Sequence, residues 1–89
     1  MQIIDRKIQI VAAVALVDID GRILISKRPA NKYLGGLWEF PGGKLENKEK
    51  AEEALIRELD EELNIKTWKS CLAPLSFSTY DYEDFNLIL

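Results

Sequence analysis

Three glutamates on one predicted helix carry the side chains best suited to chemistry in this sequence. Glu61 and Glu62 follow Glu58 by three and four residues, and residues at these offsets share one face of an α-helix. Three close carboxylates repel one another unless a cation joins them. A hard divalent cation such as Mg²⁺ or Mn²⁺ takes oxygen ligands and bridges to phosphate groups. Bound there, it would orient a pyrophosphate and activate a water molecule for attack at phosphorus.

The alternative is that these carboxylates form an ordinary solvated helix face, which is where acidic pairs usually lie. Arg57 can likewise be interpreted either as part of a functional site or as an ordinary surface residue. At helical spacing it can reach Glu53 or Glu61 and support the carboxylates. It can equally form a surface ion pair, which contributes under about 1 kcal/mol to stability.

The helix that carries these residues is predicted to run from Glu49 to Leu63. Its start is ambiguous, because Lys50 at the expected cap position has no oxygen to accept a hydrogen bond, whereas Asn47 could cap an earlier start. Its end is clearer, since Asn64 tolerates the left-handed conformation that terminates helices. Apolar residues recur at helical spacing and predict the buried stripe: Ala51, Ala54, Leu55, Leu59 and Leu63.

The segments before the helix predict strands and a loop. Ile8 to Asp18 is rich in Val, Ile and Ala without alternation, which favours a central strand covered on both faces. Asp20-Gly21 predicts a tight turn, after which Arg22 to Arg28 would close a β-hairpin. Pro29 to Gly36 is typical of a loop that leaves room for a ligand. Leu37 to Phe40 is predicted to be a short extended piece.

Pro41 ends that piece, and Gly42-Gly43 permits unusual backbone angles or the close approach of a ligand. After the helix, Lys66 to Thr79 and Glu83 to Leu89 are predicted to form two further strands. A turn around Asp81 to Asp84 would separate them.

Composition limits the class of protein. A chain of 89 residues with 47% hydrophobic and 30% charged residues is typical of one small folded domain. The net charge of -3 and pI of about 4.9 argue against a nucleic-acid polymer as partner. The apolar run Ile8 to Val17 is too short to span a bilayer, so we expect no membrane partner and a cytoplasmic location. The single cysteine, Cys71, is predicted to be buried and inert.

One stretch resembles a known family. Gly43 is followed after five residues by Glu49, and after seven more by Arg57-Glu58-Leu59-Asp60-Glu61-Glu62-Leu63-Asn64-Ile65. With FPGGKLE around its start, this run resembles the Nudix box of hydrolases that split nucleoside diphosphates linked to another group. Only Asn64 departs from the pattern, standing where the family has Gly, and Asn is a conservative replacement in backbone terms.

The resemblance implies an α/β fold, the Nudix-type α/β/α sandwich with a mixed β-sheet. Family members are longer, so residues 1–89 would form a single, incomplete domain that lacks the C-terminal strands and helix. A sheet that stops at Leu89 would expose an unpaired edge and an apolar face, which favours self-association.

The resemblance also assigns roles to residues of the box. The three carboxylates of Glu58, Glu61 and Glu62 would bind Mg²⁺ or Mn²⁺ together with the backbone carbonyl of Gly42. Arg57 would orient the glutamates, and Glu49 would brace the loop and the helix. Arg57 and the three glutamates are thus the expected catalytic residues.

The segment ISKRPANKYLGGLWEFPGGK is most similar to the MutT branch of the family. That branch converts oxidised purine nucleoside triphosphates such as 8-oxo-dGTP to the monophosphate and pyrophosphate, and a close relative acts on CTP-type triphosphates. By match, Arg28 would contact phosphates, Phe40 would pack against the base and Lys44 would stabilise the departing pyrophosphate. Alternatively Phe40 belongs to the core, and Arg28 and Lys44 are simply solvated.

Two hypotheses of different classes follow. The first is an active Mg²⁺-dependent nucleoside triphosphate pyrophosphatase that cleanses the nucleotide pool and so assists DNA repair. The second is a truncated, non-catalytic Nudix-like domain that folds only by associating with another chain. The Nudix-like recognition domain of an adenine DNA glycosylase is disfavoured, because the carboxylate set is complete here.

Overall fold

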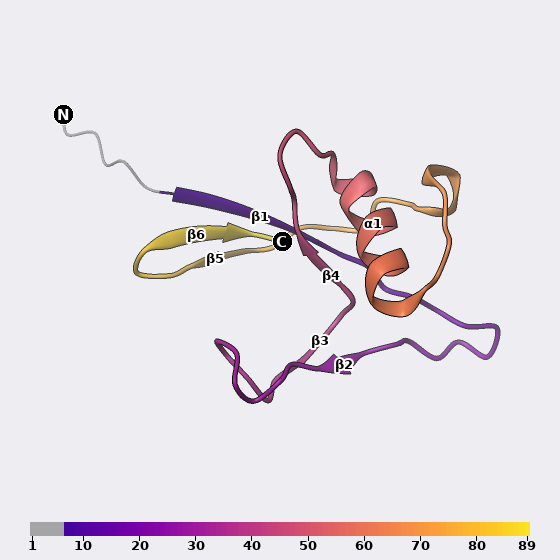
Figure 1. Cartoon of the computed structure of the whole chain (residues 1–89), viewed down its shortest axis with the longest axis horizontal. Helices are drawn as coiled ribbons and strands as arrows, with labels where there is room; N and C mark the ends of the chain where they lie inside the picture. The colour runs from indigo at the N-terminus through magenta and orange to yellow at the C-terminus, as the bar shows by residue number, and fades with distance from the viewer. Residues whose placement is uncertain (1–6) are drawn as a thin grey trace.

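A computed structural model describes residues 7–89 of the chain, which form a mixed sheet with one α-helix packed against it (Figure 1). The sheet has the order β4-β1-β6-β5. Its central strand β1 (Lys7–Ala13) is parallel to β6 (Phe85–Ile88) and antiparallel to β4 (Gly42–Lys44). β5 (Thr79–Asp81) pairs antiparallel with β6. The predicted mixed α/β architecture is therefore confirmed.

The central place of β1 was predicted correctly, but its length and its cover were not. The strand ends at Ala13, where its pairing with Gly42 ends, and not at Asp18. Ile8, Ile10 and Ala12 alternate onto one face of the strand. Ala12 is buried, whereas Ile8 is 66% and Ile10 46% exposed. The expectation of cover on both faces was wrong, because Ile8 and Ile10 remain exposed although α1 packs against β1.

The turn predicted at Asp20-Gly21 is present, and hydrogen bonds between Asp18 and Arg22 close it. The chain beyond it forms a second ladder. β2 (Ser26–Lys27) pairs antiparallel with β3 (Trp38–Glu39), and the predicted loop of residues 29–36 joins them. The hairpin is thus confirmed at its turn, while its second arm pairs with β3.

The helix α1 (Ala51–Leu63) begins two residues later than predicted. Lys50 is its N-cap, and the Glu53 carboxylate accepts a 3.2 Å hydrogen bond from the Lys50 amide. The cap is thus provided from inside the helix, and the earlier start from Asn47 is not used. At the other end Asn64 adopts the predicted left-handed conformation with φ 54°, and its amide donates to the Asp60 carbonyl.

Within the predicted buried stripe, Ala54 and Leu59 are buried and Leu55 is half-buried. Ala51 and Leu63 are exposed, so the two ends of the stripe were predicted wrongly. Since α1 packs against β1 and β4, the buried residues at the centre of the helix fix its distance from the sheet.

The segment after the helix differs most from expectation. No strand occupies residues 66–78, where a single 3-10 turn, η1 (Lys69–Cys71), is flanked by irregular chain. Cys71 is exposed, so its predicted burial was wrong. Strand β6 lies within the predicted Glu83 to Leu89, and it is an inner strand between β1 and β5. The expected open edge is therefore not at the last strand, since Leu89 also pairs with Ser78, and β5 is the edge strand on this side of the sheet.

Among residues 7–89, no helix has the length and apolar character needed to cross a membrane.

Candidate active site

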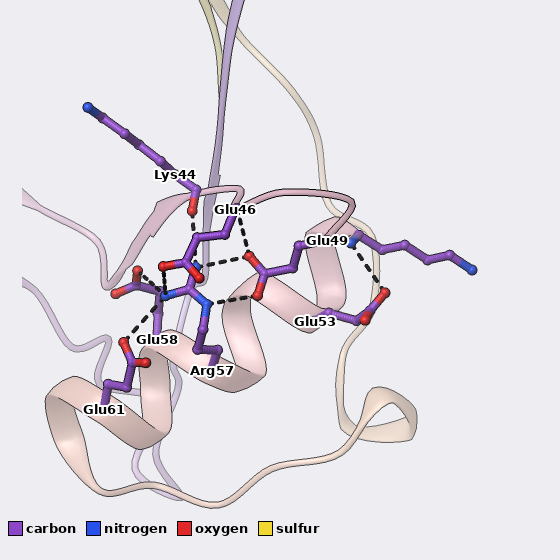
Figure 2. Close-up of polar contacts among 8 residues, drawn as sticks. Lys44, Glu46, Glu49, Glu53, Arg57, Glu58 and Glu61 are labelled. Atoms are coloured by element: carbon purple, nitrogen blue, oxygen red, sulfur yellow. Dashed lines mark hydrogen bonds and ion pairs between the residues drawn. The ribbon is translucent and has the colours of Figure 1, made fainter.

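Arg57 lies at the centre of the polar contacts around the start of α1 (Figure 2). Its Nε donates to Oε2 of Glu49 at 2.7 Å, and its Nη2 donates to Oε1 of the same carboxylate at 2.9 Å. The two side chains are largely shielded, with 19% and 13% of their surface exposed. A paired, charge-assisted contact of this kind fixes the orientation of both groups.

The same guanidinium also holds two of the glutamates expected at the metal site. Nη1 of Arg57 donates to Oε1 of Glu58 at 2.9 Å and to Oε2 of Glu61 at 3.3 Å. It lies 3.3 Å from Glu46, and Nη2 donates to the Lys44 carbonyl at 3.1 Å. One cation thus connects the loop before the helix with the carboxylates on it.

Glu49 completes the connection from the loop side. Its Oε1 accepts a 2.9 Å hydrogen bond from the Glu46 amide, in addition to the two bonds from Arg57. The Arg57 side chain is the main cause that lowers the pKa of Glu49 to about 2, and the Glu46 amide adds to it. The same contact raises the pKa of Arg57 above its usual value. The pair therefore stays ionised through the physiological range.

Two glycines bring the backbone of β4 close to its neighbours. A Cβ at Gly43 would lie 2.4 Å from Oε1 of Glu58, so the carboxylate rests against this backbone only because residue 43 has no side chain. Gly42 has φ 155°, and a Cβ there would lie 2.0 Å from the Ala12 carbonyl oxygen. The glycine pair thus allows β4 to lie against both β1 and Glu58.

The third expected metal ligand, Glu62, is near Glu58. Partial desolvation of its carboxylate is the main cause that raises the pKa of Glu62 to about 6, although the residue is exposed as a whole, and the hydrogen bond and charge of Glu58 raise it further. The structure therefore brings the predicted carboxylates to one face of the helix. Within residues 7–89, however, no three Asp, Glu or Cys side chains already form a group that could hold a metal ion. Arg57 engages Glu58 and Glu61 in this arrangement.

The expected substrate residues lie in different environments. The Lys44 ammonium points away from the carboxylates, although the Lys44 carbonyl belongs to their network (Figure 2). Phe40 is 48% exposed, which excludes the alternative that it is a core residue. Arg28 is fixed rather than free in solvent, because its Nε donates to the Tyr33 carbonyl at 2.6 Å and its Nη1 lies 3.5 Å from Glu39.

Sequence reasoning missed two acidic residues and misplaced a third. Glu46 contacts Arg57, and its only signal was its position three residues before Glu49. Glu39 acts electrostatically on Glu62, and only the pairing of β2 with β3 could have indicated its place. Glu53, considered as a partner of Arg57, accepts a hydrogen bond from Lys50 instead.

A groove of about 630 Å³ lies along β1, away from most of these side chains. Lys44 is the one expected site residue that lines it, and the exposed Ile8 and Ile10 supply its apolar part. The groove contains neither Arg28 nor Phe40, nor any of the three glutamates.

A sequence model of the family described as NUDIX domain matches residues 12–89. The chain is 40% identical over 85 residues to an 8-oxo-dGTP diphosphatase of Proteus vulgaris, covering 96% of this chain and 74% of that protein. It is 49% identical over 61 residues to a CTP pyrophosphohydrolase of Escherichia coli, covering 68% of this chain and 44% of the relative. An 8-oxo-dGTP diphosphatase of Escherichia coli is 38% identical over 80 residues, with 90% and 56% covered.

Solved structures agree in fold. The Escherichia coli ORF135 protein superposes with a TM-score of 0.73 at 36% identity, covering 93% of this chain and 57% of that one. A MutT protein from Methanosarcina mazei superposes with a TM-score of 0.76 over 96% of this chain and 61% of its own, and at 22% identity it shows the fold alone. The chain thus spans between 44% and 74% of the length of these five proteins.

Proposed function

The chain belongs to the Nudix family, and we propose that it hydrolyses nucleoside triphosphates to the monophosphate and pyrophosphate with the help of a divalent cation. The observation that carries this proposal is the set of hydrogen bonds that Arg57 donates to carboxylates of the box. One guanidinium fixes Glu49 in the loop and both Glu58 and Glu61 on the helix. An isolated surface ion pair would not hold three carboxylates of the box in one arrangement.

The donor set fits a hard cation. Glu58, Glu61 and Glu62 supply carboxylate oxygens from one helix face, and the carbonyl of Gly42 lies on the strand that packs against that helix. Desolvation is the main cause that raises the pKa of Glu62, and the neighbouring Glu58 carboxylate adds a repulsion that a cation would compensate. We therefore propose Mg²⁺, or Mn²⁺, as the cofactor held by these four residues. Such an ion would neutralise phosphate charge and lower the pKa of a bound water.

The residues of the chain divide the remaining work. Arg57 fixes the positions of Glu58 and Glu61 relative to the loop before the helix. Arg28, which two partners hold in place, offers its guanidinium to the phosphates of the substrate. The exposed face of Phe40 is available to pack against a base. Lys44 would reach the departing pyrophosphate by rotating its flexible stem, because its ammonium points elsewhere in this arrangement.

We propose oxidised purine nucleoside triphosphates such as 8-oxo-dGTP as substrates. Two of the relatives bear the name 8-oxo-dGTP diphosphatase. The CTP pyrophosphohydrolase of Escherichia coli supports a pyrimidine triphosphate as the competing substrate. Cleansing the cytoplasmic nucleotide pool, and thereby assisting DNA repair, is the cellular role that follows from the first choice.

The test is a hydrolysis assay over a panel of nucleotides that includes 8-oxo-dGTP, dGTP and CTP, with Mg²⁺ or with a chelator. We expect pyrophosphate release that needs the metal and is abolished by Glu61→Gln. Glu52→Gln is a matched control, because it removes the same charge from the first turn of the same helix. No release at high enzyme concentration would exclude the proposal.

The alternative drawn from the sequence, a non-catalytic domain that folds only with another chain, gains no advantage from these findings. It predicts an oligomer whose melting temperature rises with protein concentration. Sedimentation of the same preparation would decide it, and a folded, active monomer would exclude it.

A further inference from the structure

We propose that Glu39 is a positioning residue that holds Arg28 ready for the triphosphate. The inference deepens the proposed function and rests on it, since Arg28 is the expected phosphate ligand. It concerns the ladder of β2 and β3, which lies outside the sequence of the box.

The strand register places the two side chains on one face. Ser26 pairs with Glu39, and Lys27 pairs with Trp38. Arg28 follows Ser26 by two residues, and its amide donates to the Leu37 carbonyl at 2.8 Å. Arg28 is therefore the diagonal neighbour of Glu39, a distance that long side chains bridge.

The side chain of Arg28 is held on two sides. Its Nε donates to the Tyr33 carbonyl at 2.6 Å, and its Nη1 lies 3.5 Å from Oε2 of Glu39. The backbone is also fixed, because the Gly36 amide donates to the Arg28 carbonyl at 2.9 Å. The Arg28 side chain nevertheless remains 35% exposed, so its guanidinium can still donate to a phosphate oxygen.

This ladder also lies beside the carboxylates of α1. The charge of Glu39 acts on Glu62, and the charge of Lys32, in the loop between the two strands, acts on Glu62 in the opposite sense. Glu39 therefore lies near Glu62 as well as beside Arg28. In this place it can set the direction of the guanidinium relative to the metal-binding face.

The alternative is that Glu39 is a bystander on the surface, 45% exposed. The two possibilities predict effects of opposite sign. Removing a bystander's negative charge beside an anion site would tighten the binding of a triphosphate. Removing a positioning residue would weaken binding, because Arg28 would sample orientations that do not meet the phosphates.

The first test is the kinetics of Glu39→Gln with the nucleotide that the wild-type protein hydrolyses best. We expect KM to rise about two- to fivefold, the scale of a partly exposed ion pair, with kcat changed less than about twofold. In an Arg28→Ala background Glu39→Gln should have no further effect on KM, since its partner is gone. Glu52→Gln, on the first turn of α1, is the matched control and should leave KM unchanged.

A second readout separates this inference from the proposed function. Binding of inorganic tripolyphosphate with Mg²⁺ is measured by calorimetry for the wild-type protein and the same variants. If the wild-type protein binds without hydrolysing nucleotides and Glu39→Gln weakens binding, the proposed function fails and the positioning role stands. The inference would be overturned if Glu39→Gln bound tripolyphosphate as tightly as the wild-type protein or more tightly. It would also be overturned if Glu39→Gln weakened binding equally in the Arg28→Ala background, or if the wild-type protein did not bind tripolyphosphate.

Discussion

The guanidinium of Arg57 and the carboxylate of Glu49 meet through two parallel hydrogen bonds, although eight residues separate them in the chain. The contact joins the loop before α1 to the middle of the helix. Because Arg57 also binds Glu58 and Glu61, the position of the loop and the position of the carboxylates are set by one side chain.

Arg57→Lys should lower hydrolysis about 10- to 100-fold, the usual effect of losing a group that orients metal ligands. A lysine keeps the charge, but it cannot reproduce the bidentate contact that the guanidinium makes with the Glu49 carboxylate. Steady-state kinetics would measure the loss of hydrolysis, and the melting temperature of the variant should be several degrees lower than that of the wild-type protein. Arg22→Lys is the control, because Arg22 pairs with Asp18 in an exposed turn. Equal activity of Arg57→Lys and the wild-type protein would contradict the proposal that the bidentate contact with Glu49 positions the metal ligands.

Acid should destabilise the fold through Glu49. Its folded pKa of about 2 lies below the ordinary value of 4.5, so ionised Glu49 contributes stability that is present above pH 4.5 and lost as the pH falls toward 2. Urea unfolding at pH 7, 4 and 3 should show a falling midpoint, and Glu49→Gln should flatten that dependence between pH 4.5 and 2. A midpoint that falls equally in Glu49→Gln would assign the acid sensitivity to other groups.

Divalent cation binding should be detectable without nucleotide. We expect Mg²⁺ or Mn²⁺ to raise the melting temperature of the wild-type protein, because a ligand of the folded state stabilises it by mass action. Glu58→Gln should remove most of that rise, since the Glu58 carboxylate is close both to the backbone of Gly43 and to Glu62. Glu52→Gln should keep it. A rise of equal size in Glu58→Gln would place the cation elsewhere.

Substitutions at the two glycines should have different consequences. Gly42→Ala should cost about 1–3 kcal/mol in the free energy of unfolding, because φ 155° is unfavourable for alanine and the new Cβ meets the Ala12 carbonyl. Gly43→Ala should lower hydrolysis more than stability, because its Cβ meets the Glu58 carboxylate, which can move aside. Denaturant unfolding and kinetics of both variants would test this, and matching losses in both assays would contradict it.

Asn64 ends the helix in the left-handed conformation with φ 54°. Asn64→Ala should lower the free energy of unfolding by about 1 kcal/mol, whereas Asn64→Gly should leave it unchanged or raise it. Thermal melting of the two variants would measure the difference. If Ala and Gly have the same effect, the conformation of this residue does not limit stability.

The sequence predicted the features that depend on local spacing. The helix, its left-handed end at Asn64 and the turn at Asp20-Gly21 follow from neighbouring residues, and the structure confirms them. The spacing of Glu58, Glu61 and Glu62 likewise predicted their shared helix face. That face requires only helical periodicity.

Features set by distant segments were not predictable in this way. The partners of Arg57 in the loop depend on how β4 packs against the helix, and the place of Glu39 depends on the pairing of β2 with β3. The strand expected from Lys66 onward failed because an apolar composition does not provide a pairing partner. Likewise, Ile8 and Ile10 are suited to burial, but they remain exposed although α1 packs against β1.

The buried centre of the helix interface is narrow because two of its members are alanines, Ala12 on β1 and Ala54 on α1. Each has only a methyl group, so the helix lies close enough to the strands for Glu58 to rest on the backbone of Gly43. A valine at either alanine would act as a wedge between the layers. It would move the Glu58 carboxylate away from the backbone of Gly43 without substituting any residue that defines the box. The short distance between the helix and the strands is therefore itself a condition for the site.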